Sequence, residues 1–196
     1  MAITEGDVHP RAGRPRDPAC DAAILQATLD VFAEEGYAGV SMEGVALRAG
    51  VGKATIYRRY STKAELVVEA VRCGAHMVDH LPDTGDLRAD LLSMMRPLVD
   101  RLRGDDGKLM TTFAMERFRN PDLADEFDRS VIGTKREHVR KLVTAAIERG
   151  DLPADADVEL IAETPPALLW HHALYGLPID DALLERILDL VLPSAR

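Results

Sequence analysis

The apolar residues of this chain recur at spacings of three and four positions, the period of a helix that packs on one side. The clearest stripe lies between residues 86 and 103 and consists of Leu87, Leu91, Met94, Leu98 and Leu102. No stretch of useful length alternates between apolar and polar residues as a half-buried strand does, and no segment repeats. The pattern therefore predicts an all-α fold of about nine helices.

Capping residues, glycines and prolines divide the pattern into individual helices. Ser41 has the chemistry of a helix N-cap, and Thr62 with Glu65 has the spacing of a capping box. Gly36 and Gly150 are expected to end helices. The expected helices span residues 18–35, 41–49, 53–60, 62–80, 86–103, 108–120, 121–150, 155–175 and 180–192.

The helix expected at 155–175 contains two adjacent prolines, Pro165 and Pro166. Each proline lacks the amide donor of a helix and clashes with the preceding turn. We therefore expect this helix to break, with Thr164 capping a second segment that has Pro165 at its first position.

Residues 41–63 read SMEGVALRAGVGKATIYRRYSTK and predict two short helices joined by a glycine turn. The chain carries a net charge of -9, yet every charged residue between Gly44 and Lys63 is a cation. These cations are Arg48, Lys53, Arg58, Arg59 and Lys63, and the expected core of the motif is Val45, Ala46, Val51 and Ile56. Basic charge concentrated on such a motif is typical of a protein that reads DNA.

The segment VALRAGVGKATIYRRYSTKAEL resembles the DNA-binding signature of the TetR-type (TetR/AcrR-like) bacterial transcriptional regulators. The resemblance covers residues 18–66 and includes the Ala-Gly-Val turn, the Thr55-Ile56-Tyr57 run, Tyr60 and Lys63. Gly52 departs from the family pattern, because serine or threonine is more usual there and could cap the second helix. The resemblance implies a three-helix DNA-binding domain followed by a helical domain that binds a small molecule and dimerises.

By this resemblance, the second helix of the motif enters the major groove, where arginine can bridge guanine O6 and N7. Tyr60 and Lys63 are expected to contact phosphates instead. For Arg48 and Arg59, a solvated face is as good an interpretation as DNA contact. The predicted DNA-binding residues are Arg14, Arg16, Ser41, Lys53, Ala54, Thr55, Tyr57, Arg58, Tyr60 and Lys63.

Charge divides the chain into three expected parts. Residues 1–17 form a flexible basic arm whose Arg14 and Arg16 resemble arms that enter the minor groove, although a solvating tail is the alternative. Residues 18–66 form the DNA-binding domain, and residues 67–196 form the effector-binding and dimerisation domain. The net charge is -1 over residues 1–66 and -8 over residues 67–196, which suits a second domain that does not touch DNA.

Methionines and aromatic residues gather in the predicted helices 86–103 and 108–120 and after the double proline. They suit either an ordinary core or an adaptable apolar pocket with a few polar groups. The predicted pocket residues are Met94, Leu98, Met110, Phe113, Phe118, Trp170, His171 and Tyr175. The last helix has a broad apolar face, so a homodimer is expected to form through Leu184, Ile187, Leu188 and Val191. The segment after Pro166 is expected to join this interface and complete a four-helix bundle across a two-fold axis.

Other functions find less support in the sequence. Cys73, His76 and His80 would share one face of a helix that reached residue 80, so a metal site is an alternative to two surface histidines and a small buried cysteine. Gly52-Lys53 lacks the spacing of a phosphate loop, and no nucleophile motif or carboxylate pair predicts an enzyme. No cofactor is expected. A DNA-binding protein without any ligand is a second alternative.

Composition favours a globular protein, since 46% of its residues are hydrophobic. Two cysteines cannot build a disulfide framework, and no apolar run reaches the roughly 20 residues that span a bilayer. The first residues lack the apolar core of a secretory signal. We therefore expect a cytoplasmic protein. The family resemblance implies further that it is a bacterial, nucleoid-associated repressor released from a palindromic operator by a small molecule.

Overall fold

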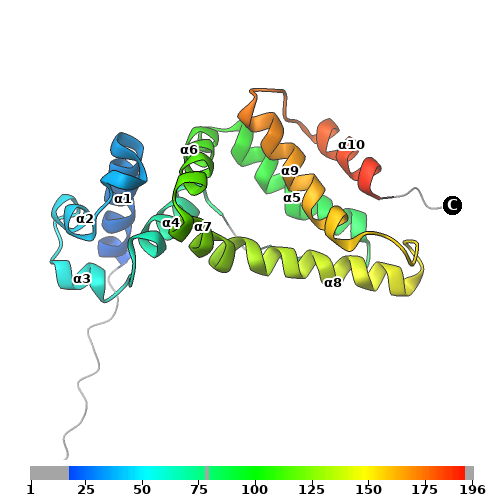
Figure 1. Ribbon diagram of the computed structural model, residues 1–196, viewed down its shortest axis with the longest axis horizontal. Helices are drawn as coiled ribbons and strands as arrows, with labels where there is room; N and C mark the ends of the chain where they lie inside the picture. Colours follow the sequence, from blue (N-terminus) through cyan, green and yellow to red (C-terminus); the bar gives the residue numbers. More distant parts are fainter. Residues whose placement is uncertain (1–17, 78–79, 193–196) are drawn as a thin grey trace, which may run out of the picture.

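The computed structural model describes residues 18–77 and 80–192, and this part of the chain is all-α, as the sequence predicts. Its elements, in chain order and as they are labelled in Figure 1, are α1 (Pro18–Gly39), α2 (Met42–Arg48), α3 (Lys53–Tyr57), α4 (Lys63–Gly74), α5 (Leu87–Arg103), α6 (Asp106–Arg119), α7 (Pro121–Phe127), the π-helical turn η1 (Asp128–Ile132), α8 (Gly133–Arg149), α9 (Val158–Leu174) and α10 (Asp181–Val191). Arg14 and Arg16 lie outside the described residues.

The molecule is elongated, with α1 to α3 at one end and α5, α9 and α10 at the other (Figure 1). Helices α6 and α7 lie between the two ends and pack against α4. Met110, Phe113 and Leu123 from this middle region share one core with the buried residues of α1 to α4. A second core joins α5, α8, α9 and α10. The N-terminal helices are thus packed directly onto α6 and α7.

The helix boundaries near the N-terminal end agree with the sequence except at α3, which ends at Tyr57 instead of Tyr60, and at α4. Gly36 has φ 69° and ends the regular part of α1. Thr62 Oγ1 accepts from Glu65 N at 3.0 Å, as the capping box requires. Helix α4, however, ends at Gly74 rather than near residue 80, and His76 adopts a left-handed φ of 48°.

The early end of α4 removes the geometry on which a metal site would depend. Cys73, His76 and His80 no longer share a helical face, and each has a different neighbour. Cys73 Sγ lies 3.6 Å from Glu69 Oε1, His76 Nδ1 lies 3.6 Å from Asp106 Oδ2, and His80 Nε2 lies 2.6 Å from Ser93 Oγ. The metal interpretation is therefore wrong in its geometry.

Helix α9 is continuous through Pro165 and Pro166, so the expected break is wrong. Its N-cap is Asp157, whose side chain accepts from Leu160 N at 3.0 Å, and Thr164 lies within the helix. Burial explains the continuity, because Pro165 is part of the interior and α9 packs against both α8 and α10. Packing of this kind offsets the two missing amide donors.

The apolar face of α10 is directed into its own chain. Leu184, Ile187 and Leu188 are all buried in the second core, where α10 packs against α5 and α9. They cannot be the surface that a second copy contacts, so this part of the predicted dimer interface is wrong. Val191, by contrast, is only partly buried. The sequence reveals that the face is apolar but not which partner covers it.

Candidate DNA-binding surface and ligand cavity

Helices α2 and α3 form the predicted helix-turn-helix. Ser41 caps α2, since its Oγ accepts from Gly44 N at 3.0 Å. Gly50 takes φ 66° in the turn, a conformation that side chains with a Cβ avoid. Helix α3 begins after Gly52, which supplies no side-chain cap, and backbone bonds from Arg59 and Tyr60 to the carbonyl of Ile56 extend it by one turn. The Ser41 cap and the left-handed Gly50 thus fix the start of α2 and the turn that follows it.

One face of α3 is exposed and basic. Lys53, Ala54, Tyr57 and Arg58 occupy the positions i, i+1, i+4 and i+5 and are all exposed, whereas Ile56 on the opposite face is fully buried. Thr55 is half-buried between them. The structure therefore brings together most of the residues predicted to enter the major groove.

An acidic residue also stands at this face. Tyr57 Oη donates to Glu43 Oε1 at 2.9 Å. This hydrogen bond lowers the pKa of the Glu43 carboxyl and raises the pKa of the Tyr57 phenol. Glu43 lies one position before the acid-free stretch of the sequence, and only the packing of α2 against α3 reveals that it meets Tyr57.

The two arginines with open assignments are engaged in ion pairs within the domain. Arg48 donates to both carboxylate oxygens of Glu34, at 2.6 and 2.7 Å, and lies 3.8 Å from Asp30. Arg59 pairs with Asp21 of α1. Both arginines therefore join the helix-turn-helix to α1, which favours a structural role.

Tyr60 and Lys63 are likewise occupied in packing. Burial is the main reason why the pKa of Tyr60 rises to about 12, with the charges of Glu69 and Asp21 adding to the effect. Lys63 Nζ donates to the Tyr37 carbonyl at 3.0 Å and lies 4.0 Å from the centre of the Tyr37 ring. The structure does not place these two side chains with the exposed residues of α3.

Tyr37 ties the DNA-binding end to the rest of the chain. Its ring is buried, its backbone N–H donates to Glu116 Oε2 of α6 at 3.3 Å, and its hydroxyl donates to Asp122 Oδ2 of α7. Burial and the Asp122 carboxylate both raise the pKa of the Tyr37 phenol. We call Tyr37, Lys63, Glu116 and Asp122 the Tyr37 junction.

A cavity of about 360 Å³ lies where the predicted pocket was expected, between α5, α6, the α7–η1–α8 helix and α9. Four predicted residues line it, namely Met94, Leu98, Met110 and Trp170. The sequence analysis did not select the other lining residues Met77, Met95, Arg101, Arg117, Phe127, Asp128, Ile132, Lys135, Arg136, Val139, Ala162, Glu163, Pro166 and Ala167. The cavity has mostly apolar walls with a few charged groups, which is how small-molecule sites are generally built.

The other four predicted pocket residues lie elsewhere. Phe113 is buried in the first core, where its ring packs on Phe127 at 4.9 Å between centroids. Phe118 and Tyr175 are 82% and 72% exposed, and His171 is exposed beside Tyr175. These predictions are wrong because sequence spacing places residues on a helix without showing which face turns inward.

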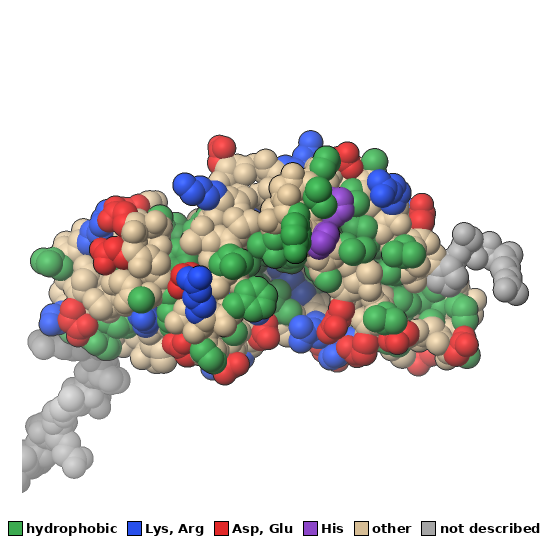
Figure 2. All heavy atoms as spheres, turned by 45° about the horizontal axis from the view of Figure 1, so that its top comes forward, with side chains coloured by type: hydrophobic (Ala, Val, Ile, Leu, Met, Phe, Trp, Pro, Cys, Tyr) green, Lys and Arg blue, Asp and Glu red, His purple; other side chains and the backbone are tan. Residues whose placement is uncertain are grey.

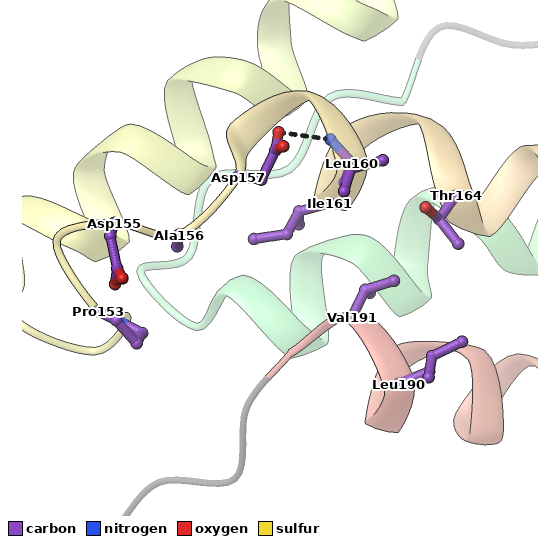
Figure 3. A pocket seen from close by; sticks show the side chains of 9 residues that line it. All are labelled: Pro153, Asp155, Ala156, Asp157, Leu160, Ile161, Thr164, Leu190 and Val191. Carbon is purple, nitrogen blue, oxygen red and sulfur yellow. Dashed lines mark hydrogen bonds between the residues drawn. The ribbon is translucent and has the colours of Figure 1, made fainter.

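Exposed apolar side chains gather instead on the outer face of α9 and α10, and Figure 2 shows green side chains collected beside the purple histidines on that part of the molecule. Leu174, Tyr175 and Leu177 are exposed at the end of α9. At its other end, Leu160 and Leu190 are 62% and 73% exposed and line an open hollow between the start of α9 and the end of α10 (Figure 3). We call these five residues the outer α9–α10 face.

The fold and the basic face of α3 define the class of the protein, which is that of the helix-turn-helix DNA-binding regulators. The chain belongs to the TetR family. Residues 24–70 match the family model for bacterial regulatory proteins of the tetR family, and residues 81–191 match the tetracyclin repressor-like C-terminal domain.

Known relatives agree with this assignment. The chain is 33% identical to the DNA-binding transcriptional repressor TetR of Mycobacteroides abscessus over 181 residues, which cover 89% of this chain and 95% of that protein. It is 30% identical to the HTH-type transcriptional regulator Rv1556 of Mycobacterium tuberculosis, with 96% of each chain covered. The crystal structure of the TetR family regulator SCO0332 matches with a TM-score of 0.64 and 27% identity, over 88% of this chain and 96% of that one.

Within residues 18–77 and 80–192, no helix is long and apolar enough to cross a membrane.

Proposed function

We propose that this DNA-binding regulator is a repressor that binds a palindromic operator as a homodimer at the bacterial nucleoid and leaves it when a small molecule fills the cavity. The proposal rests on the position of α4. This helix begins at Lys63, in the Tyr37 junction, and Met77, three residues after its end, lines the cavity. The short segment 63–77, which is α4 and the turn after it, thus reaches from the DNA-binding end to the cavity.

The exposed residues of α3 are proposed to read the operator. The Arg58 side chain is exposed and forms no hydrogen bond or ion pair with another described residue, so its guanidinium is free to bridge a guanine. Tyr57 must exchange its bond to Glu43 for one to DNA. Ser41, already a cap through its oxygen, retains its hydroxyl proton for a phosphate.

The outer α9–α10 face is proposed as the dimer interface in place of the buried residues of α10. Leu160, Ala167, His171 and Leu174 lie on one exposed stripe of α9 at spacings of seven, four and three, with small Ala167 allowing close approach of a partner helix. An uncovered apolar face of this extent is an association surface. Two copies related by a two-fold axis would present two α3 helices to one duplex.

Release follows from the geometry that such a dimer needs. Two α3 helices occupy successive major grooves only when they lie about 34 Å apart, one turn of the duplex. A ligand that displaces Met77 would shift α4 and, through Lys63 and the Tyr37 junction, change that spacing. Ligand binding and DNA binding would then oppose each other reciprocally.

The test combines stoichiometry with ligand release. Sedimentation of the protein with its operator should give two chains per duplex, and Leu174→Glu with Leu190→Glu should give monomers that no longer bridge the half-sites. The matched control is Leu47→Glu, because Leu47 is also exposed but lies on α2. An intact dimer in the double variant would refute this interface.

The second experiment tests ligand release. A ligand that changes the fluorescence of Trp170, the only tryptophan, should release DNA. A ligand that binds without releasing DNA would refute the proposed coupling between the cavity and the operator.

A further inference from the structure

The charged groups of the cavity wall are mainly cationic. Its lining contains four cations, Arg101, Arg117, Lys135 and Arg136, against two carboxylates, Asp128 and Glu163. The carboxylates are already paired: Arg117 Nη2 lies 2.9 Å from Asp128 Oδ1, and Arg136 Nε lies 3.5 Å from Glu163 Oε1. The wall therefore holds a surplus of positive charge.

Arg101 is the cation in this wall that lacks a partner. Its residue is half-buried on α5, its side chain forms no hydrogen bond or ion pair with another described residue, and its Nε is inaccessible to solvent. Burial lowers the pKa of its guanidinium, although the charges of Asp106 and Asp100 oppose the shift. Arg117 Nε, in the same wall, is also buried without a hydrogen-bond partner.

Buried donors without partners are uncommon in folded proteins, and two of them lining one cavity call for an acceptor that enters it. A guanidinium presents its N–H groups as a planar fork that matches the two oxygens of a carboxylate. The rest of the wall is apolar and rich in methionine, with Met77, Met94, Met95 and Met110, together with Trp170. Such a wall suits a hydrocarbon or aromatic body.

We propose that the cavity binds a small amphipathic carboxylate, with its charged end on the Arg101 guanidinium and its apolar body between the methionines and Trp170. The assignment rests on the proposed function, since it names the effector class of the same cavity. A volume of about 360 Å³ lies near the lower limit of small-molecule sites. A cationic ligand would meet the surplus of positive charge, and a neutral ligand would leave Arg101 without an ionic partner.

The test compares ligands that share a body and differ at the head. Calorimetry with the full chain would use decanoate, decanol and decylamine below their aggregation limits, and 2-naphthoate with its matching alcohol and amine. Charge-assisted hydrogen bonds of about 1.5–3 kcal/mol correspond to about a 10- to 100-fold preference for the carboxylate over the alcohol in at least one set. Arg101→Met should reduce this preference to a few-fold. The matched control is Arg103→Met, which changes an exposed arginine of α5 and should keep the preference.

Three results would overturn the assignment: an alcohol or amine that binds as tightly as its carboxylate, a full preference in Arg101→Met, or no binding of either carboxylate. If circular dichroism shows that Arg101→Met does not fold, the comparison of head groups in the unaltered chain still decides, and Arg101→Lys should give an intermediate preference. Operator release separates the two proposals. Carboxylates that bind without releasing DNA would support the proposed ligand class and refute the proposed release of the operator. A neutral ligand that binds as tightly as its carboxylate and releases DNA would support the release and refute the ligand class.

Discussion

Replacing Tyr37 by Phe tests whether the Tyr37 junction holds the DNA-binding end to α6 and α7. The change removes the hydroxyl that donates to Asp122 and keeps the buried ring, the contact of that ring with Lys63 and the backbone bond to Glu116. No cavity forms, so the loss is confined to one hydrogen bond. A bond to a charged acceptor contributes about 1.5–3 kcal/mol. Because Asp122 is exposed and regains water, we expect the free energy of unfolding to fall by about 1 kcal/mol.

The Tyr37 hydroxyl should also make the free energy of unfolding depend on pH in the alkaline range. An ordinary tyrosine ionises near pH 10, whereas burial and Asp122 raise the pKa of folded Tyr37. The contribution of the Tyr37 hydroxyl to the free energy of unfolding is fully present below the pKa that Tyr37 has in the unfolded chain. This contribution is lost as the pH rises, because Tyr37 releases its proton in the unfolded chain first. The free energy of unfolding should therefore fall more steeply above about pH 10 in the unaltered chain than in Tyr37→Phe. Tyr60, with a pKa of about 12, leaves some slope in both proteins.

The assay is urea unfolding followed by circular dichroism at a series of pH values. Tyr175→Phe is the matched control, because the Tyr175 hydroxyl is on an exposed side chain and forms no hydrogen bond within the described residues. That variant should match the unaltered chain both in stability and in the slope of its alkaline limb. Equal stabilities and equal alkaline slopes in Tyr37→Phe and the unaltered chain would refute the role given to the junction.

Three further changes test separate parts of the account. Glu43→Gln should tighten operator binding by about two- to fivefold, because an exposed carboxylate beside α3 repels phosphates; weaker binding in anisotropy titrations would mean that Tyr57 needs Glu43 for its position. Leu188→Ala should lower the free energy of unfolding by about 2–5 kcal/mol, because the side chain is fully buried; unchanged stability with loss of the dimer would restore Leu188 to the interface. Arg14→Ala should make the salt dependence of DNA binding shallower, and an unchanged slope would mean that Arg14 contacts no phosphate.

Local signals in the sequence suffice for the all-α fold and for the helix-turn-helix. Ser41, Gly50 and Thr62 act through bonds or backbone angles within a few residues, so their roles are visible in the sequence itself. Helix propensity and periodicity do the same for α5. A cavity lies between the helices where the methionine-rich pocket was expected, because Met94 and Met110 belong to stripes that both predicted helices direct inward. Its use as a ligand pocket stays a prediction.

The errors arise where tertiary packing decides. Pro165 and Pro166 are strong helix breakers in isolation, yet the neighbours of α9 keep the helix intact. Leu188 is apolar whether a second copy or α5 covers it, so periodicity cannot distinguish an interface from a core. Arg101, which lines the cavity, was missed because an arginine in a helix usually points to solvent. Only its place in the cavity and its lack of a partner reveal it.

The most direct test of the central claim is a footprint on the DNA upstream of the protein's own gene, followed by anisotropy titrations on the protected site. The account predicts a palindromic footprint and a loss of about 1–3 kcal/mol of binding free energy in Tyr57→Ala and in Arg58→Ala. Arg186→Ala, an exposed arginine of α10, should bind as the unaltered chain does. No protected site, or unaltered affinity in both α3 variants, would contradict the claim that this face of α3 reads the operator.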